Sequence, residues 1–216
     1  MTSRTVLAKS SFYKAAAFAG GVGLSMFSYP THAAPSTIGD TVQGLYDTLL
    51  NTMRNGRILG QSGRFAKLEP AIRRSFDIPA MARLSVGPFW AGLNEAQRQQ
   101  MTESFGRYIS AVYADRFDSY AGQKLEVTGE QPAPSGVLVK SQIIKASGEP
   151  VKVDYMMRRS GDNWLISDIY LDGAISEVAT RRSEFAAILK TGGIDGLIAA
   201  LNRKTSLLTA ATASSF

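Results

Sequence analysis

VKVDYMMRRSGDNWLISDIYL, residues 151–171, is the stretch that decides the fold. Every second residue of its first half is apolar: Val151, Val153, Tyr155 and Met157. This period of two is typical of a strand with one buried face. A Ser-Gly-Asp-Asn segment at 160–163 is typical of a hairpin turn, and it leads into a second strand-like run over 164–171. The stretch therefore predicts two antiparallel strands.

The same pattern extends upstream of residue 151. A short strand is predicted around Leu125 and Val127, a Pro- and Gly-containing turn at 132–136, a strand over 137–145 and a turn at 147–150. Connections this short join antiparallel neighbours. The sequence thus predicts a meander of about four strands.

Helical periodicity flanks the meander on both sides. Helices are expected over 37–54, around 65–76, after the capping residue Asp77 and from Asn94 onward. The helix after Asn94 is predicted to be the longest, with an apolar stripe of Met101, Phe105, Ile109, Val112 and Phe117. Two further helices, separated by Gly192-Gly193, follow the strands. Helices, then a meander, then helices predict an α+β fold in which an antiparallel β-meander is packed by helices.

The first 33 residues are typical of a secretory signal. Arg4, Lys9 and Lys14 precede an apolar run at 15–29, and the segment closes on Thr31-His32-Ala33. The run is shorter than the roughly 20 residues of a membrane span, although an uncleaved anchor remains an alternative. We expect residues 1–33 to be a signal peptide, residues 34–204 a single α+β domain and residues 205–216 a flexible tail. The expected location is the bacterial periplasm.

Composition restricts the available chemistry. The chain of 216 residues has no cysteine, and its one histidine, His32, lies in the predicted signal. A Ser-His-Asp triad and a cysteine nucleophile are thereby excluded from the processed chain, and a zinc site is disfavoured. The formal net charge is +6, and residues 1–33 carry three basic and no acidic residues, so +3 remains. We expect no cofactor, no metal and no nucleic-acid partner.

Two sets of side chains remain as candidates for function. The first is a group of late carboxylates, which suits a hydrolase or isomerase or else serves turns, caps and solvated faces: Asp162, Asp168, Asp172, Glu177 and Glu184. The second is the inward apolar and aromatic set, which either fills a core or lines a cavity. Periodicity cannot separate a filled core from a hollow one. A binding protein, a ligand-free adaptor and an enzyme with a cone-shaped pocket therefore stay open.

Several segments occur in the order seen in a known family. They include Phe76-Asp77-Ile78, LSVGPFW at 84–90, GDNWLISDI at 161–169 and TGGIDGL at 191–197. Over residues 38–204 the chain resembles the MlaC family of periplasmic lipid-transport proteins, also called toluene-tolerance auxiliary components of ABC transporters. Within that family it is most similar to the hopanoid-associated HpnM branch. It departs at Ala174-Ile175, where the family more often has Val-Ser.

The resemblance implies that the domain of residues 34–204 is lipid-binding and that the protein is a lipid carrier rather than an enzyme. It implies helices and a curved sheet around a deep apolar pocket that takes a phospholipid or a hopanoid. The implied partners are an inner-membrane lipid transporter complex and an outer-membrane lipoprotein complex, in a role that maintains outer-membrane lipid asymmetry. The residues expected to line the pocket follow from the inward faces of the predicted elements alone: Phe76, Leu84, Phe89, Trp90, Phe105, Ile109, Val112, Tyr113, Phe117, Val153, Tyr155, Met157, Trp164 and Ile166.

Overall fold

The computed structural model of the chain describes residues 37–210. The predicted signal segment at 1–33 and residues 211–216 lie outside the described residues. Five α-helices and one five-stranded sheet make up the described part. None of the helices within residues 37–210 combines the length and the hydrophobicity that a membrane span requires.

The elements follow one another in the predicted order. The first helices are α1 (Ile38–Arg54), α2 (Gly56–Ser75), α3 (Ile78–Val86), the 3₁₀ helix η1 (Gly87–Gly92) and α4 (Glu95–Arg116). The strands are β1 (Lys124–Ala133), β2 (Gly136–Ile144), β3 (Pro150–Ser160), β4 (Asn163–Leu171) and β5 (Ile175–Ser176). Helix α5 (Glu177–Ala210) ends the described chain. The predicted α+β class is confirmed.

The sheet is an antiparallel meander with strand order β1-β2-β3-β4-β5. It differs from the prediction in two strands. β1 is ten residues long and includes Pro132, which pairs with Val137 across the hairpin. Proline is tolerated there because β1 is an edge strand, whose outer N–H groups need no partner in the sheet. β5 is a two-residue strand too short to give a periodic signal.

Side chains replace backbone bonds at one point of the β2–β3 ladder. Paired residues are interrupted between Val139↔Tyr155 and Gln142↔Lys152. There the amide of Ser141 donates to the Asp154 carboxylate at 3.3 Å, and the Ser141 hydroxyl donates to the Val153 carbonyl. This interruption places the Ser141 hydroxyl where a side chain from α1 can reach it.

Helix ends follow the capping chemistry of the sequence. The Asp77 carboxylate accepts from the Ala80 amide at 3.1 Å at the start of α3. Asn94 and Gln97 form a reciprocal capping box at the start of α4. In α5, Gly193 adopts a φ of 61°, which favours glycine and divides the element into two helical segments, as predicted.

Helix α5 extends past residue 205, where the flexible tail was expected to begin. Residues 205–210 belong to α5, and the Thr205 side chain is buried, with its hydroxyl donating to the Leu201 carbonyl at 2.9 Å. A segment of small and polar residues can continue a helix when its inward side chains find a packed neighbour. The described part of α5 therefore reaches Ala210.

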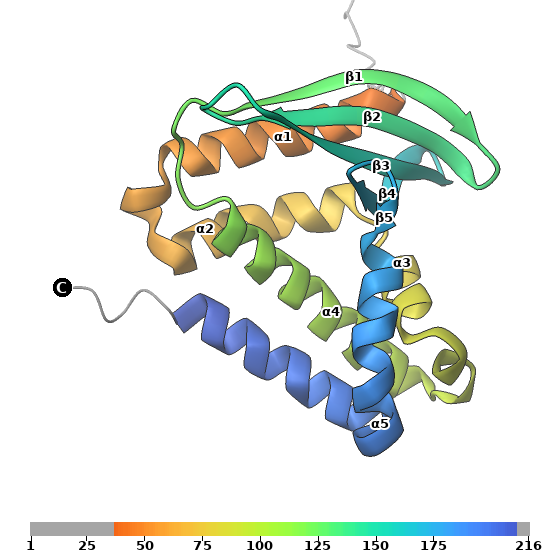
Figure 1. The fold of residues 1–216 in the computed structure, drawn as a ribbon. Helices are drawn as coiled ribbons and strands as arrows, with labels where there is room; N and C mark the ends of the chain where they lie inside the picture. The colour runs from red at the N-terminus through yellow and green to blue at the C-terminus, as the bar shows by residue number, and fades with distance from the viewer. Residues whose placement is uncertain (1–36, 211–216) are drawn as a thin grey trace, which may run out of the picture. The chain divides into compact units, whose positions relative to one another are not determined.

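Figure 1 shows the helices on one side of the sheet, with α1 alongside β1 and β2, α4 farther from the sheet and α5 leading away from β5. The junction of α2 and α3 is tied to the sheet, because Phe76 forms a bridge with Ile166 and the Asp77 amide donates to the Ile166 carbonyl at 2.8 Å. The buried core extends from the sheet through α1, α2 and α3 to the contact between α4 and α5. The space between α4 and the sheet is only partly filled.

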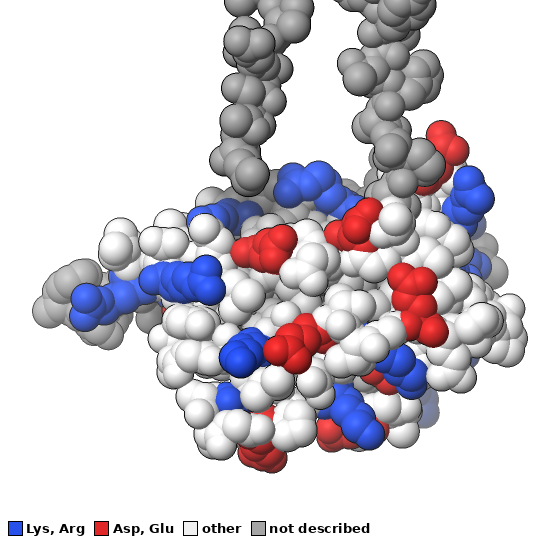
Figure 2. Space-filling model, turned by 90° about the horizontal axis from the view of Figure 1, so that it is seen from above, with Lys and Arg blue, Asp and Glu red and all other residues white. Residues whose placement is uncertain are grey.

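The face seen from above carries mixed charge. Figure 2 shows acidic and basic side chains of the described residues interspersed over it. Two ion pairs on the strands and their turns follow the same pattern, Lys140 with Asp154 at 3.0 Å and Lys145 with Glu149 at 2.9 Å. Basic and acidic groups on the sheet thus offset one another locally.

A candidate ligand cavity between α4 and the sheet

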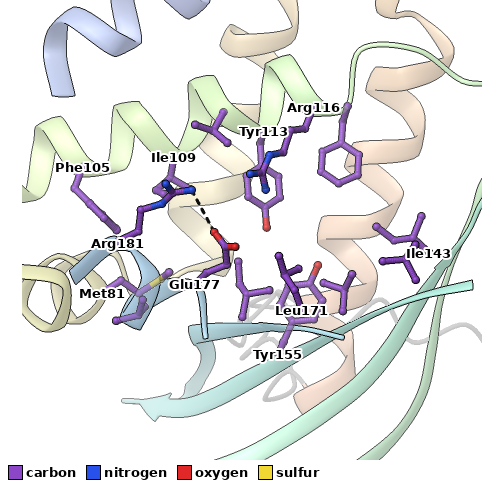
Figure 3. Close-up of a pocket in the computed structure, with 16 residues that line it drawn as sticks. Met81, Phe105, Ile109, Tyr113, Arg116, Ile143, Tyr155, Leu171, Glu177 and Arg181 are labelled. Carbon is purple, nitrogen blue, oxygen red and sulfur yellow. Dashed lines mark hydrogen bonds and ion pairs between the residues drawn. The ribbon is translucent and has the colours of Figure 1, made fainter. Parts of the chain in front are cut away.

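An apolar cavity of about 200 Å³ lies between α4 and strands β2, β3 and β4 (Figure 3). The beginning of α5 and one residue of α3 complete its wall. The lining side chains are Met81, Phe105, Ile109, Val112, Tyr113, Arg116, Phe117, Ile143, Val151, Val153, Tyr155, Ile169, Leu171, Glu177, Val178 and Arg181. Thirteen of these sixteen residues are aliphatic or aromatic, so the wall suits a hydrocarbon.

The cavity has a closed end and an open end. Met81 and Phe105 are buried at one end, where the Phe105 ring meets the Phe185 ring edge-on at 6.4 Å. Ile143 and Val151 are half-buried, and Arg116 is exposed. Figure 3 shows Phe105 and Met81 at one side of the cavity and Ile143 at the other. A ligand that enters by the exposed end therefore meets the buried end last.

The size of the cavity permits binding of an apolar group. An engineered cavity of about 150 Å³ lined by Leu, Ile and Phe stays dry and binds benzene. The cavity beneath α4 is larger, and its wall is of the same kind. It offers room for part of a hydrocarbon chain or ring without structural rearrangement.

Four hydroxyl groups, hereafter the hydroxyl chain, run from the interrupted ladder to the cavity. Ser141 donates to the Val153 carbonyl, so Tyr46, whose hydroxyl lies 2.5 Å from that of Ser141, donates to Ser141. The Tyr155 hydroxyl interacts with those of Tyr46 and Tyr113, and Figure 3 shows the Tyr113 and Tyr155 side chains pointing toward one another. The hydroxyl chain thus links α1, the sheet and α4 by polar contacts.

Burial keeps the three tyrosines of the hydroxyl chain, Tyr46, Tyr113 and Tyr155, neutral. Loss of hydration raises the pKa of Tyr113 and Tyr155 well above the usual value, and the neighbouring tyrosines raise the pKa of Tyr155 further. Burial also raises the pKa of Tyr46, although the hydrogen bond with Ser141 opposes the shift. The polar part of the wall near Tyr113 and Tyr155 is therefore uncharged at neutral pH.

Charge is concentrated where α4 and α5 meet. Arg181 pairs with Glu177 at 3.2 Å and with Glu184 at 2.7 Å. Burial lowers the pKa of Arg181, but the bond to Glu184 and the attraction of both carboxylates outweigh it, so the pKa is raised. Arg116, on α4, has no carboxylate among residues 37–210 within 4.0 Å of its guanidinium. Of the two arginines on the wall, Arg181 is therefore paired with carboxylates and Arg116 is not.

Asp168 positions the part of α5 that enters the wall. Its carboxylate accepts from the Ser176 hydroxyl at 2.6 Å and from the Val178 amide at 3.1 Å, at the first turn of the helix. An acidic group at a helix N-terminus satisfies free amides and complements the helix dipole. Asp168 therefore acts as a cap and does not face the cavity.

The other late carboxylates do not gather at one point. Asp162 and Asp172 are exposed in turns, and Glu184 pairs with Arg181, so only Glu177 of the five lies on the cavity wall. Within residues 37–210, no group of three or more His, Cys, Asp or Glu side chains is placed to hold a metal ion.

The residues expected in the pocket fall into three groups in the structure. On the wall are Phe105, Ile109, Val112, Tyr113, Phe117, Val153 and Tyr155. Buried in the core behind it are Phe76, Met157 and Ile166, with the Phe76 ring packed edge-on against Tyr113 at 5.6 Å. Outside the cavity are Leu84, Phe89, Trp90 and Trp164: Leu84 and Trp90 line a separate groove beside η1, Phe89 is exposed and Trp164 is half-buried.

Nine wall residues were not anticipated: Met81, Arg116, Ile143, Val151, Ile169, Leu171, Glu177, Val178 and Arg181. For two of these residues the sequence did contain a pattern that indicates a place on the wall. Arg116 follows Val112 by four positions and so shares its helix face, and Val151 precedes Val153 in the alternating strand. For the α5 residues the sequence held no such signal, because their approach to the cavity depends on how α5 leaves β5.

Comparisons with known proteins agree with the fold. The family model described as MlaC protein matches residues 43–203. A solved structure similar to the chain is that of the phospholipid-binding protein from Ralstonia solanacearum in complex with a phospholipid. The two are 24% identical, the match covers 80% of this chain and 99% of that chain, and the TM-score is 0.70. This likeness shows a shared fold.

Proposed function

Because the chain belongs to the MlaC family, we propose that it is a lipid-binding transport protein rather than an enzyme. The observation that carries the proposal is the apolar cavity with one buried and one exposed end. Burial of hydrocarbon is worth about 0.8 kcal/mol for each CH₂ group, so a chain or ring that fills the cavity is held without any covalent chemistry. The protein of shared fold from Ralstonia solanacearum, which is phospholipid-binding, supports the same reading.

The proposal extends to the ligand and the route. The ligand is a phospholipid or a hopanoid-type lipid, whose apolar part enters by the exposed end of the cavity. The protein carries it through the periplasm between an inner-membrane lipid transporter complex of the ABC type and an outer-membrane lipoprotein complex. Support for this route comes from family membership and from the signal-like sequence of residues 1–33.

Lipid extraction tests the binding step. The protein is purified from a Gram-negative host, extracted with organic solvent and analysed by mass spectrometry, and the delipidated protein is then incubated with phospholipid vesicles. We expect about one lipid per protein molecule in both experiments. Protein that holds no lipid in either experiment refutes the proposal in favour of a ligand-free adaptor.

A pair of matched variants tests the cavity itself. Ile109→Trp fills space between α4 and the sheet, whereas Ile58→Trp makes the same chemical change at a side chain that is 86% exposed. We expect Ile109→Trp to reduce lipid uptake by about tenfold or more and Ile58→Trp to leave it unchanged. Denaturant unfolding verifies that both variants fold. A folded Ile109→Trp protein with normal uptake contradicts the assignment of the cavity.

N-terminal sequencing tests export. Expressed in a Gram-negative host, the processed protein is expected in the periplasmic fraction with Ala34 as its first residue. An intact N-terminus in the membrane fraction supports the anchor instead.

A further inference from the structure

The open end of the cavity continues into a groove between α4 and α5. Val112, Arg116 and Arg181 line both, and Tyr108, Asp115, Lys204, Leu207 and Leu208 complete the groove. A ligand can therefore extend from the cavity into the groove past Arg116. The polar part of a ligand, which the apolar wall does not accommodate, would lie in this groove.

The groove contains two cations that no carboxylate neutralises. Within residues 37–210, no Asp or Glu oxygen lies within 4.0 Å of the charged nitrogens of Arg116 or Lys204. Lys204 instead lies over the face of the Tyr108 ring, 5.8 Å from its centre. Arg181 is already bound by two carboxylates, and Asp115 is the further acidic residue of the groove. The balance of unpaired charge beside the opening is thus positive.

The orientation of an amphipathic ligand follows from the wall. Its apolar part is buried most completely if it points to the Phe105 end, and its polar part then lies at the exposed end beside Arg116. An arginine presents a planar fork of N–H donors that matches the oxygens of a phosphate. A lysine on the adjacent helix adds a second positive charge to the same position.

We propose that Arg116, assisted by Lys204, binds the phosphate of a phospholipid whose apolar part enters the cavity. The inference rests on the proposed lipid binding and deepens it, because it selects a lipid with a negatively charged phosphodiester over an uncharged polycyclic lipid. Both side chains are exposed, so salt screens their effect and the contribution is modest.

Two soluble ligands with the same acyl chains isolate the phosphate. Dioctanoyl phosphatidylglycerol and dioctanoylglycerol differ only in the headgroup, and their binding to delipidated protein is measured by calorimetry. The test variant is Arg116→Gln/Lys204→Gln. The matched control is Arg57→Gln/Arg203→Gln, which removes the same charge from two exposed positions outside the cavity and the groove.

We expect the test variant to bind the phosphatidylglycerol about three- to tenfold more weakly and the diacylglycerol with unchanged affinity. The control should bind both ligands as the wild type does, and added salt should remove the difference between the test variant and the wild type. Equal loss for both ligands, or no loss for either, overturns the role of Arg116 and Lys204 while leaving lipid binding intact. Wild-type protein that binds neither ligand refutes the proposed function instead.

Glycerol 3-phosphate separates a lipid headgroup from a free phosphate as the anion. We expect it to bind much more weakly than dioctanoyl phosphatidylglycerol, because it gains nothing from the apolar wall. Equal affinity for the two overturns the assignment to a lipid and identifies a site for soluble phosphate compounds.

Discussion

Replacing Tyr155 with Phe removes the central oxygen of the hydroxyl chain and little else. The ring stays in place, so its edge-on contact with Tyr46, at 5.9 Å between ring centres, is retained. The Tyr46 and Tyr113 hydroxyls both lose their contact with Tyr155, and Tyr46 keeps its bond to Ser141. The variant therefore isolates the contribution of one buried hydroxyl.

The expected cost follows from these contacts. A hydrogen bond contributes about 0.5–1.5 kcal/mol net, and a buried polar group without a partner costs about 1–3 kcal/mol. Two hydroxyl contacts of Tyr155 are lost, those with Tyr46 and Tyr113, so at about 1 kcal/mol each we expect the free energy of unfolding to fall by about 2 kcal/mol. For a domain of this size, Tm falls by about 2–4 °C for each kcal/mol, which gives about 4–8 °C.

Urea unfolding monitored by circular dichroism provides the measurement, with Tyr120→Phe as the matched control. Tyr120 is exposed, so its change should stay within about 0.5 kcal/mol of the wild type. The double variant Tyr113→Phe/Tyr155→Phe should lose less than the sum of the two single variants, because the two hydroxyls interact. A Tyr155→Phe protein as stable as the wild type would refute the hydroxyl chain as a source of stability.

Other predictions concern the caps and the response to pH. Asp77→Ala should lower the free energy of unfolding by about 1 kcal/mol with an unchanged denaturant slope, because the Ala80 amide loses its acceptor. Asp168→Asn should cost about 1–2 kcal/mol and also weaken lipid uptake, whereas Asp162→Asn in an exposed turn should do neither, as unfolding and vesicle assays will show. Because burial raises the pKa of Tyr155, the unfolded chain loses this proton first, near pH ~10, so stability should fall as pH rises beyond that value. Unfolding midpoints at about pH 9 and about pH 11 measure this fall, which should be smaller in Tyr155→Phe, and an equal fall in both proteins would contradict it.

The fold could be predicted largely because its signals are local. Alternation in β3, the hairpin segment at 160–163 and the caps at Asp77 and Asn94 each depend on a few neighbouring residues. The prediction failed where tertiary context decides. β5 forms only because β4 offers it an edge, and residues 205–210 remain helical because the inward side of α5 packs on the domain.

The cavity was harder to predict than the fold, because apolar periodicity describes a face without saying how closely the facing element approaches. Phe76 and Tyr113 have similar sequence signals and touch one another, but only Tyr113 borders the cavity. The free cation of the wall, Arg116, is likewise a tertiary property, because it depends on which carboxylates α5 brings near.

The burial gradient of the cavity wall has a kinetic consequence for transfer. A wall closed at Phe105 and exposed beside Arg116 loads and unloads through the same opening. Under the function proposed above, a donor complex and an acceptor complex that both exchange lipid with the protein would use overlapping surfaces around that opening. The two complexes would then compete for the protein and form no ternary complex with it. Transfer would proceed by a two-step cycle in which excess acceptor, by occupying the empty protein, slows the overall flux.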